Sequence, residues 1–258
     1  MLDPKRADAY THHLNGSALV VQRRTPSRFK SEYEKMLFHA HIVPTFTEAL
    51  YEQKHCYLEQ PEWMRLYESL VEETPWLTDR SPVIIHTRMQ MLPLCSILPD
   101  TAEAMNPDKY DGGLLMTLEL KARQHHKKLL QCLEDYKSHV VRMSMSNAPA
   151  SELALRREVF GTALECLCVY KRILGALCEA ERLQLETETQ ALAVLILDLQ
   201  NQPAPRHSWL YSTHEKGVAA AVQVTREIWE RDDSDATPRE KRLAACARWH
   251  EFNQFLHG

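Results

Sequence analysis

The stretch DGGLLMTLELKARQHHKKLLQCLEDYKSHVV, residues 111–141, decides the fold class of this chain. Its apolar residues recur at steps of three and four on one side of a helix, and Lys, Gln and His residues occupy the other side. The apolar positions are Leu114, Leu115, Leu118, Ala122, Leu129, Leu133, Tyr136 and Val140. This spacing predicts a long amphipathic helix.

Glycine is scarce: the chain has 7 in 258 residues, and only Gly112-Gly113 are adjacent. Hairpin turns and phosphate-binding loops need backbone conformations that glycine adopts most easily. The chain therefore has few places to build a β-hairpin or a nucleotide-binding loop. Because helical spacing recurs throughout, we expect an all-α fold of about eight to ten helices in a single domain spanning residues 1–258.

Helix boundaries follow from proline, asparagine and serine positions. Ser27 or Ser31 can cap the second helix, which contains Pro44. The helix that opens at Pro82 is expected to be interrupted or to end near Pro93, and to be closed by Pro99. Ser151 is a candidate cap for a strongly apolar central helix. The expected helices cover about 5–24, 31–50, 61–73, 82–99, 111–141, 151–177, 191–199, 213–231 and 238–255.

Composition indicates an ordinary globular protein, with 44% hydrophobic and 26% charged residues. No apolar run is long enough to cross a bilayer, and the charged start Met1–Arg6 is unlike a secretory signal, so we expect a soluble intracellular protein of the nucleus or cytoplasm. Seven scattered cysteines without CxxC pairs predict buried free thiols. The net charge of -4 argues against direct DNA binding, and the basic stretch Lys121–Lys128 predicts a solvated helix face.

Several histidines and carboxylates have spacings that could suit a metal. His39 and His41 point about 200° apart on a helix, so they cannot easily share an ion. Glu52 with His55, and Asp135 with His139, could each share a helical face, as in helical di-iron sites, but such sites need further carboxylates on facing helices. We expect no metal and no cofactor. The adjacent His125 and His126 are expected to face solvent.

Four large apolar residues can be interpreted in two ways. Phe38, Trp63, Trp76 and Met89 could line an apolar cavity between helices and bind a hydrophobic small molecule. The alternative, which we favour, is that they pack in the core. The sequence contains no zinc-cluster, P-loop or hydrolase motif that would select a chemistry.

The N-terminal quarter contains motifs of a known family. These are HLNGSALV at His13–Val20, Arg24-Thr25-Pro26 with Phe29, Leu37-Phe38, His41-Ile42-Val43 and YLEQPEW at Tyr57–Trp63. They resemble the helical regulatory domain of fungal zinc-cluster transcription factors, although Thr25 stands where that family usually has Gly. The family's DNA-binding head, six cysteines beginning CxxC, has no counterpart in this sequence.

The resemblance implies a regulator-like helical domain without its own DNA-binding head, acting through a hydrophobic small molecule or a protein partner in fungal secondary metabolism. The alternative is a biosynthetic enzyme, a cyclase or isomerase, that shapes an apolar substrate in a helix-lined pocket. In that alternative His13 and His41 are the candidate catalytic residues, because imidazole transfers protons near neutral pH. A roomy interior cavity would favour the enzyme, and a packed core with an exposed apolar patch would favour the regulator.

Overall fold

The all-α fold predicted from the sequence is confirmed. The computed structural model describes residues 13, 16–74, 77–106, 108, 111–143, 150–201 and 215–230. Across these ranges it contains nine α-helices, α2 to α10, a further helical stretch at 16–24, and no β-strand. The number of helices therefore agrees with the eight to ten expected.

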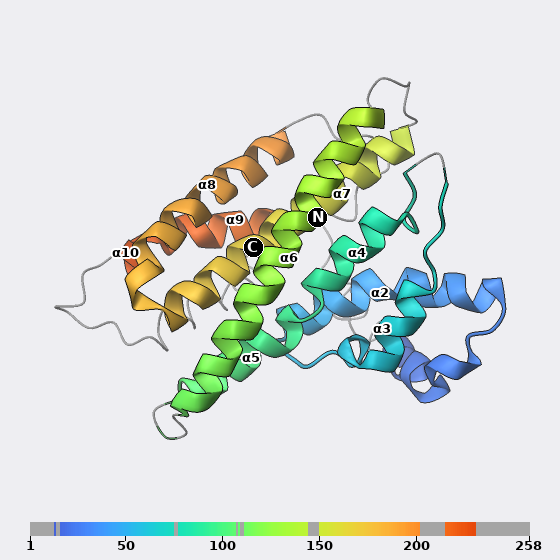
Figure 1. The fold of residues 1–258 in the computed structure, drawn as a ribbon, viewed down its shortest axis with the longest axis horizontal. Coiled ribbons are helices and arrows are strands. Elements are labelled where there is room, and N and C mark those ends of the chain that lie inside the picture. The colour runs from blue at the N-terminus through green and yellow to red at the C-terminus, as the bar shows by residue number, and fades with distance from the viewer. Residues whose placement is uncertain are drawn as a thin grey trace.

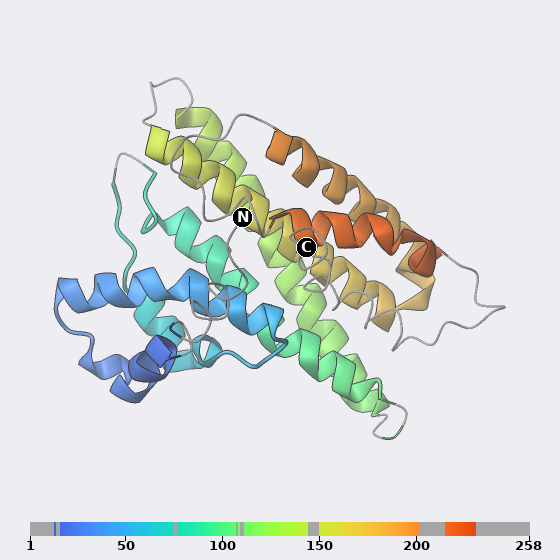
Figure 2. The ribbon, with the colours of Figure 1, turned by 180° about the vertical axis from the view of Figure 1, so that it is seen from behind.

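Two long helices form the centre of the molecule, α6 (Gly112–Met143) and α7 (Ala150–Leu177), which lie side by side. On one side of this pair lie α8 (Arg182–Asn201), α9 (Glu215–Val224) and α10 (Arg226–Glu230), as Figure 1 shows and Figure 2 shows from behind. On the other side lie α2 (Glu32–Tyr51), α3 (Pro61–Glu68), α4 (Pro82–Met91) and α5 (Leu94–Ala104). Short 3-10 turns at Pro26–Arg28, Tyr57–Glu59 and Glu179–Glu181 complete the described elements.

The buried side of α6 is the one that its sequence spacing predicts. Six of the eight predicted apolar positions are buried: Leu115, Leu118, Ala122, Leu129, Leu133 and Tyr136. Leu114 is exposed, in the first turn of the helix, and the side chain of Val140 lies outside the described residues. Each buried leucine stabilises the fold by roughly 1.5–3 kcal/mol relative to exposure, so this single stripe is a large part of the core.

Helix α2 begins with a complete capping box. The Ser31 hydroxyl accepts a hydrogen bond from the Glu34 amide at 3.3 Å, and the Glu34 carboxylate accepts one from the Ser31 amide at 2.9 Å. Ser27 instead lies in a 3-10 turn, so Ser31 is the cap. Such caps satisfy amides that the first helical turn leaves unpaired. Pro44 lies inside α2, which continues to Tyr51.

The break expected near Pro93 is confirmed, since α4 ends at Met91 and α5 begins at Leu94. Several other predicted helix boundaries are wrong. The helix expected at 191–199 begins at Arg182, the one expected at 61–73 ends at Glu68, and the one expected at 213–231 is interrupted at Thr225.

Pro99 does not close a helix but lies inside α5, which starts at Leu94 and runs to Ala104. Proline removes one amide from the helical ladder, and the burial of Leu94, Ile97 and Leu98 outweighs that loss. Ser151 is not a cap either, because α7 already begins at Ala150.

A buried ion pair joins α7, α8 and α9. The Arg172 guanidinium donates to both carboxylate oxygens of Glu186, at 2.9 and 3.2 Å, and their side chains are only 2% and 1% exposed. Arg172 also donates to the Thr225 hydroxyl at 2.6 Å and the Val222 carbonyl at 2.8 Å, and lies 5.1 Å from the Trp229 ring centre. One side chain therefore connects four elements of the helical bundle.

Several sequence predictions lie outside the described residues. They concern the helix expected at 238–255, the start of the first helix before residue 13, Trp76, and Cys246. Within the described ranges, no helix combines the length and the apolar character that crossing a lipid bilayer requires.

Candidate functional site

An aromatic cluster fixes the inner face of α2 against α3. Trp63 of α3 lies 5.5 Å from the ring of Phe38, 6.0 Å from Phe29 and 4.9 Å from Tyr57. Phe38 and Trp63 are almost completely buried. Aromatic pairs at such separations stabilise beyond their buried area, so the residues that carry the family-like motifs determine where α2 lies.

The core beside this cluster contains a buried charged side chain, Arg88, with its two carboxylate partners. Arg88 of α4 is buried, and its Nη2 atom donates to Asp79 Oδ1 at 2.9 Å and to Glu158 Oε1 of α7 at 3.3 Å. A buried guanidinium needs such acceptors, because leaving it unpaired would cost several kcal/mol. Arg88 therefore connects the loop before α4 to the centre of α7.

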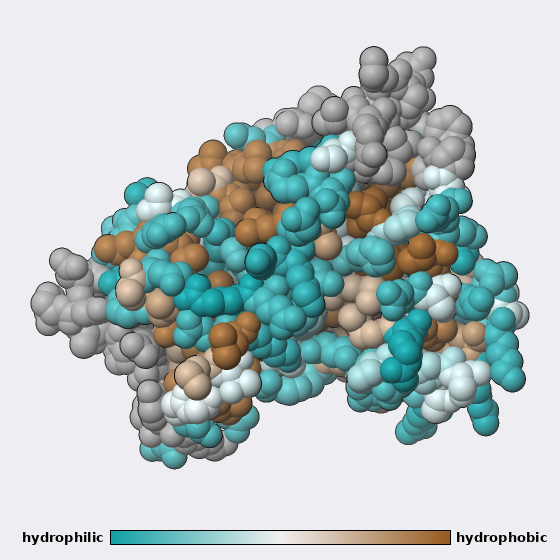
Figure 3. Space-filling model, in the orientation of Figure 1, coloured by the Kyte–Doolittle hydropathy of each residue, from teal (hydrophilic) through white to brown (hydrophobic). Residues whose placement is uncertain are grey.

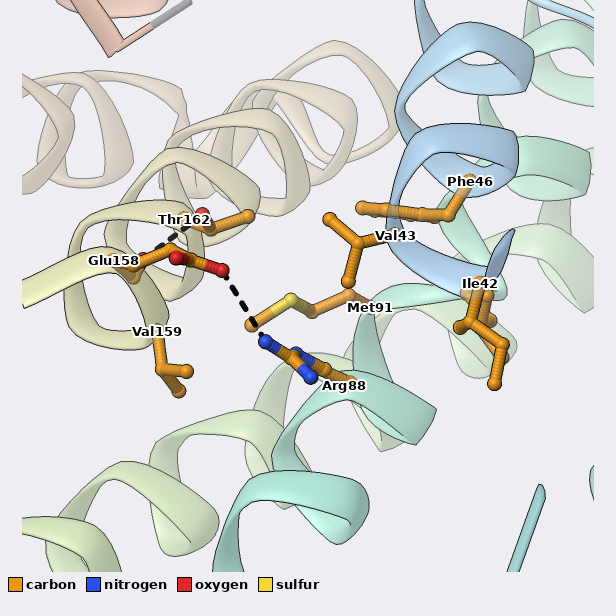
Figure 4. A pocket seen from close by; sticks show the side chains of 9 residues that line it. Ile42, Val43, Phe46, Arg88, Met91, Glu158, Val159 and Thr162 are labelled. Carbon is orange, nitrogen blue, oxygen red and sulfur yellow. Dashed lines mark hydrogen bonds and ion pairs between the residues drawn. The ribbon is translucent and has the colours of Figure 1, made fainter. Parts of the chain in front are cut away.

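A small cavity lies beside this ion pair, between α2, α4 and α7. Ile42, Val43 and Phe46 of α2 face Arg88 and Glu158 across it (Figure 4). The remaining lining residues are Met91, Leu92, Val159 and Thr162. Its volume is about 20 Å³, which is enough for one water molecule, whereas sites for organic ligands typically measure roughly 300–1,000 Å³. The cavity can hold a water against Arg88 and Glu158 but not an organic substrate.

Two more titratable side chains border this ion pair. His39 Nε2 lies 3.2 Å from the Asp79 carbonyl oxygen, and its pKa is lowered by burial and by the nearby charge of Arg88. Tyr67 is almost fully buried, its ring lies 6.3 Å from that of His39, and burial raises the pKa of its phenol. Both groups are therefore held in their neutral forms near neutral pH, which suits packing around a paired arginine.

The outer face of α2 is apolar and exposed. Tyr33, Met36 and Leu37 are 74%, 49% and 46% exposed, and Ala40 one turn further on is exposed as well. These positions follow the i, i+3, i+4, i+7 spacing of one helical face. We call this set, Tyr33, Met36, Leu37 and Ala40, the α2 outer stripe. The opposite side of the helix carries Phe38 and Ile42 in the core, so α2 is apolar on two sides.

Charged side chains border the α2 outer stripe. Arg80 approaches Met36, with its Nη1 atom 3.7 Å from the sulfur, and also lies 3.5 Å from a carboxylate oxygen of Glu32. Lys35 pairs with Glu32 at 2.9 Å. An apolar strip with a charged rim is the usual composition of a protein-binding surface.

The structure separates the residues proposed from the sequence. His13 is exposed and His41 is half-buried on α2, and neither lines the cavity described above. Phe38 and Trp63 pack against each other in the core, and Met89 is half-buried against it. Trp76 lies outside the described residues. These side chains therefore do not come together in one pocket within the described part of the chain.

Where the structure describes them, the carboxylates and histidines considered for a metal have other partners. Glu52 ends α2, so Glu52 and His55 share no helix, and His55 Nε2 pairs instead with Asp100 at 2.8 Å. Asp135 accepts a hydrogen bond from Gln131 at 3.0 Å, while the side chain of His139 lies outside the described residues. Across the described ranges no three His, Cys, Asp or Glu side chains are grouped as metal ligands.

The expectation that His125 and His126 face solvent is wrong. Both are half-buried where α6 meets α4 and α7, and His125 Nδ1 lies 3.3 Å from Gln90 Oε1. His126 lies edge-on to Tyr170, 6.4 Å between ring centres. Burial, with smaller contributions from nearby lysine and arginine charges, lowers the pKa of each imidazole to about 4. The basic stretch Lys121–Lys128 is therefore only partly solvated.

Sequence reasoning missed Arg88 and Glu158. Both lie in helices whose sequences are strongly apolar. A buried ion pair could have been suggested by this pattern, in which one apolar helix contains an arginine and another contains an acid. The sequence cannot show that the two side chains meet, because the residues are 70 positions apart.

Comparisons with protein-family models, with curated proteins and with solved structures found no match to this chain. The likeness to the regulatory domain of fungal zinc-cluster factors therefore stays a prediction that rests on the N-terminal motifs.

Proposed function

We propose that this chain is a regulator-type helical domain that acts by binding a protein partner through the α2 outer stripe. The observation that carries the proposal is that α2 is apolar on two opposite sides while only one of them is covered. A surface helix normally keeps its outer face polar. The uncovered side suits a partner.

The partner's chemistry follows from the shape and charge of the stripe. Four apolar side chains along two helical turns match the spacing by which an amphipathic helix inserts its own apolar residues. The aromatic cluster around Trp63 holds α2 in place, so the stripe is preformed and its binding costs little ordering entropy. The partner is therefore an amphipathic helix of another protein, with charges that complement Glu32, Lys35 and Arg80.

The resemblance to fungal zinc-cluster regulators supports a role in the control of secondary metabolism, inside the cell, in the nucleus or the cytoplasm. A cyclase or isomerase is the alternative from the sequence. The small volume of the cavity beside Arg88 weighs against that alternative, because an apolar biosynthetic substrate needs a much larger one. The same volume makes a cavity-bound small-molecule effector the less favoured form of the regulator.

A reporter assay tests the proposed function. The full chain is fused to an unrelated DNA-binding domain in a fungal reporter strain, and we expect reporter output to change at least several-fold. In the variant Met36→Gln/Leu37→Gln we expect that change to disappear. Glutamine forms helix well and both positions are exposed, so the variant should keep its fold.

The matched control is Met116→Gln/Leu120→Gln, which alters two exposed apolar residues of α6 instead. It should leave the reporter effect intact. A fusion without any effect, or one that the α2 variant and the α6 control reduce equally, would contradict the proposal.

A further inference from the structure

A short exposed segment connects the helical stretch at 16–24 to α2. Its sequence, RRTPSR at residues 23–28, carries three arginines and no acidic residue. Thr25 is exposed, and the 3-10 turn Pro26–Arg28 that follows it contains no buried residue. Figure 3 shows a largely hydrophilic surface at the lower right, where Figure 1 places this N-terminal part of the chain. Thr25 is therefore accessible from solvent.

Thr25 has an unusual backbone conformation. Its φ is 63° and its ψ is 148°, a combination that glycine adopts readily and that strains a β-branched residue. A residue before proline prefers a φ of about −120° with a ψ of about 120–160°. Rotation of φ alone therefore brings Thr25 to an extended conformation and releases the strain.

The residues around Thr25 can open without disturbing the core. The nearest buried side chains are Val21 before it and Phe29 after it, and the residues between them, 22–28, are exposed or half-buried. Opening breaks backbone hydrogen bonds at the edge of a helical element, such as that from the Arg28 amide to the Thr25 carbonyl at 3.2 Å. Such local opening needs far less free energy than global unfolding. Residues 22–28 are the three positions on each side of Thr25 that an enzyme binding an extended substrate would contact.

The sequence after Thr25 has the pattern that proline-directed protein kinases recognise. These enzymes accept proline directly after the target residue because their pocket for that position offers no acceptor for an amide, which proline lacks. They favour a basic residue three positions after the target, which pairs with an acidic or phosphorylated group of the enzyme. Pro26 and Arg28 meet both requirements.

Other Thr-Pro and Ser-Pro pairs in the chain lack part of this pattern. They are Thr74-Pro75, Ser81-Pro82 and Thr237-Pro238, and none has a basic residue three positions after the hydroxyl residue. Ser81 is also buried, at 3% exposure, whereas Thr74 is exposed. The full pattern therefore occurs once, and it falls on the exposed, strained Thr25.

Basic side chains beside Thr25 would stabilise the phosphorylated product. A phosphothreonine carries a charge of about −1.5 to −2 at pH 7 and three acceptor oxygens, which guanidinium groups bind well. Arg24 now pairs with Glu34, the capping-box residue of α2, and its guanidinium lies 5.4 Å from the centre of the Phe29 ring. A phosphate on Thr25 would offer Arg24 a second anionic partner at the junction that leads into α2.

We propose that Thr25 is a phosphorylation site for a proline-directed protein kinase. The Oγ1 atom of Thr25 attacks the γ-phosphorus of ATP, and the new O–P bond forms as the bond from that phosphorus to the β,γ-bridging oxygen breaks. The hydroxyl proton passes to the catalytic aspartate of the kinase, and ADP leaves. The proposal concerns a different segment from the α2 outer stripe and does not depend on partner binding there.

Treatment of the full, folded chain with a cyclin-dependent kinase, Mg²⁺ and ATP tests the proposal, with the modified residues located by mass spectrometry. We expect Thr25 to react at least about ten-fold faster than Thr74, because one charge-assisted hydrogen bond to the enzyme changes binding by about that factor. Arg28→Gln should slow the reaction at Thr25 by a similar factor for the same reason. Arg65→Gln, which removes an exposed arginine of α3, is the matched control and should leave the rate unchanged.

Variants of Thr25 itself separate the site from others. Thr25→Ser should keep the modification, and Thr25→Ala should remove it. The proposal is overturned if Thr25 stays unmodified while a reference peptide in the same sample is phosphorylated, if Thr74 or the buried Ser81 reacts as fast as Thr25, or if Arg28→Gln reacts as fast as the unchanged protein. Circular dichroism before and after the reaction reports whether each variant is folded.

Discussion

Removing one charge from the buried Arg172–Glu186 pair should destabilise the whole α7–α10 half of the molecule. Glu186→Gln keeps the shape of the side chain but leaves the guanidinium, 2% exposed, without its counter-charge. Breaking a buried pair in this way typically costs about 3–5 kcal/mol. Because Thr225, Val222 and the new amide oxygen still accept hydrogen bonds from Arg172, we expect the lower end, about 3 kcal/mol.

Thermal and urea unfolding followed by circular dichroism measure this effect. For a chain of this size, about 3 kcal/mol corresponds to a fall in Tm of roughly 6–12 °C. The double variant Arg172→Met/Glu186→Leu removes both charges and should recover at least half of the loss, since the penalty comes from the uncompensated charge.

A surface pair supplies the control. Glu230→Gln breaks the Arg226–Glu230 pair, which is 2.6 Å long and has side chains 58% and 39% exposed. Exposed pairs contribute little, so the loss should be below about 0.5 kcal/mol. The reasoning fails if Glu186→Gln costs less than about 1 kcal/mol, or if the double variant is no more stable than the single one.

Three further outcomes are expected from unfolding measurements. Trp63→Ala should lose about 3–5 kcal/mol, because it empties the centre of a buried aromatic cluster; a loss under 1 kcal/mol would show that the cluster adds little. Stability should be full above about pH 6.5, where His125 and His126 are neutral in both states, and should fall as the pH drops toward their folded pKa of about 4, by at most about 1.4 kcal/mol per pH unit for each. Partial exposure of the two imidazoles reduces that slope. A free energy of unfolding that does not change between pH 6.5 and 4.5 would contradict the prediction. Ser31→Ala should cost about 1 kcal/mol through the lost cap, whereas Ser27→Ala should cost almost nothing, and equal effects would refute the assignment of the cap.

The fold class could be predicted from the sequence because helical periodicity is a local property. The stripe from Leu115 to Tyr136 is buried as expected, and the helical start after Ser31 follows from its Ser and Glu three residues apart. Pro99 was misjudged because its local penalty is outweighed by tertiary burial of neighbouring leucines, which no local pattern reveals.

The candidate site was much less predictable. Side-chain type alone could not distinguish Phe38, which is buried, from Leu37 beside it, which is exposed, because both faces of α2 are apolar. Half-burial of His125 and His126 depends on where α4 and α7 lie relative to α6, and the meeting of Arg88 with Glu158 depends on the approach of two helices. These are long-range relations, and a single sequence does not contain them.

The Arg88–Glu158 pair has a consequence for synthesis of the chain. Ribosomes add roughly 5–20 residues per second, so about 4–14 s pass between the appearance of Arg88 and that of its partner 70 residues later. During that interval the inner face of α4 lacks the α7 surface that will cover it. We therefore expect the nascent N-terminal half to expose apolar side chains of α4 for seconds and to bind ribosome-associated chaperones during that time.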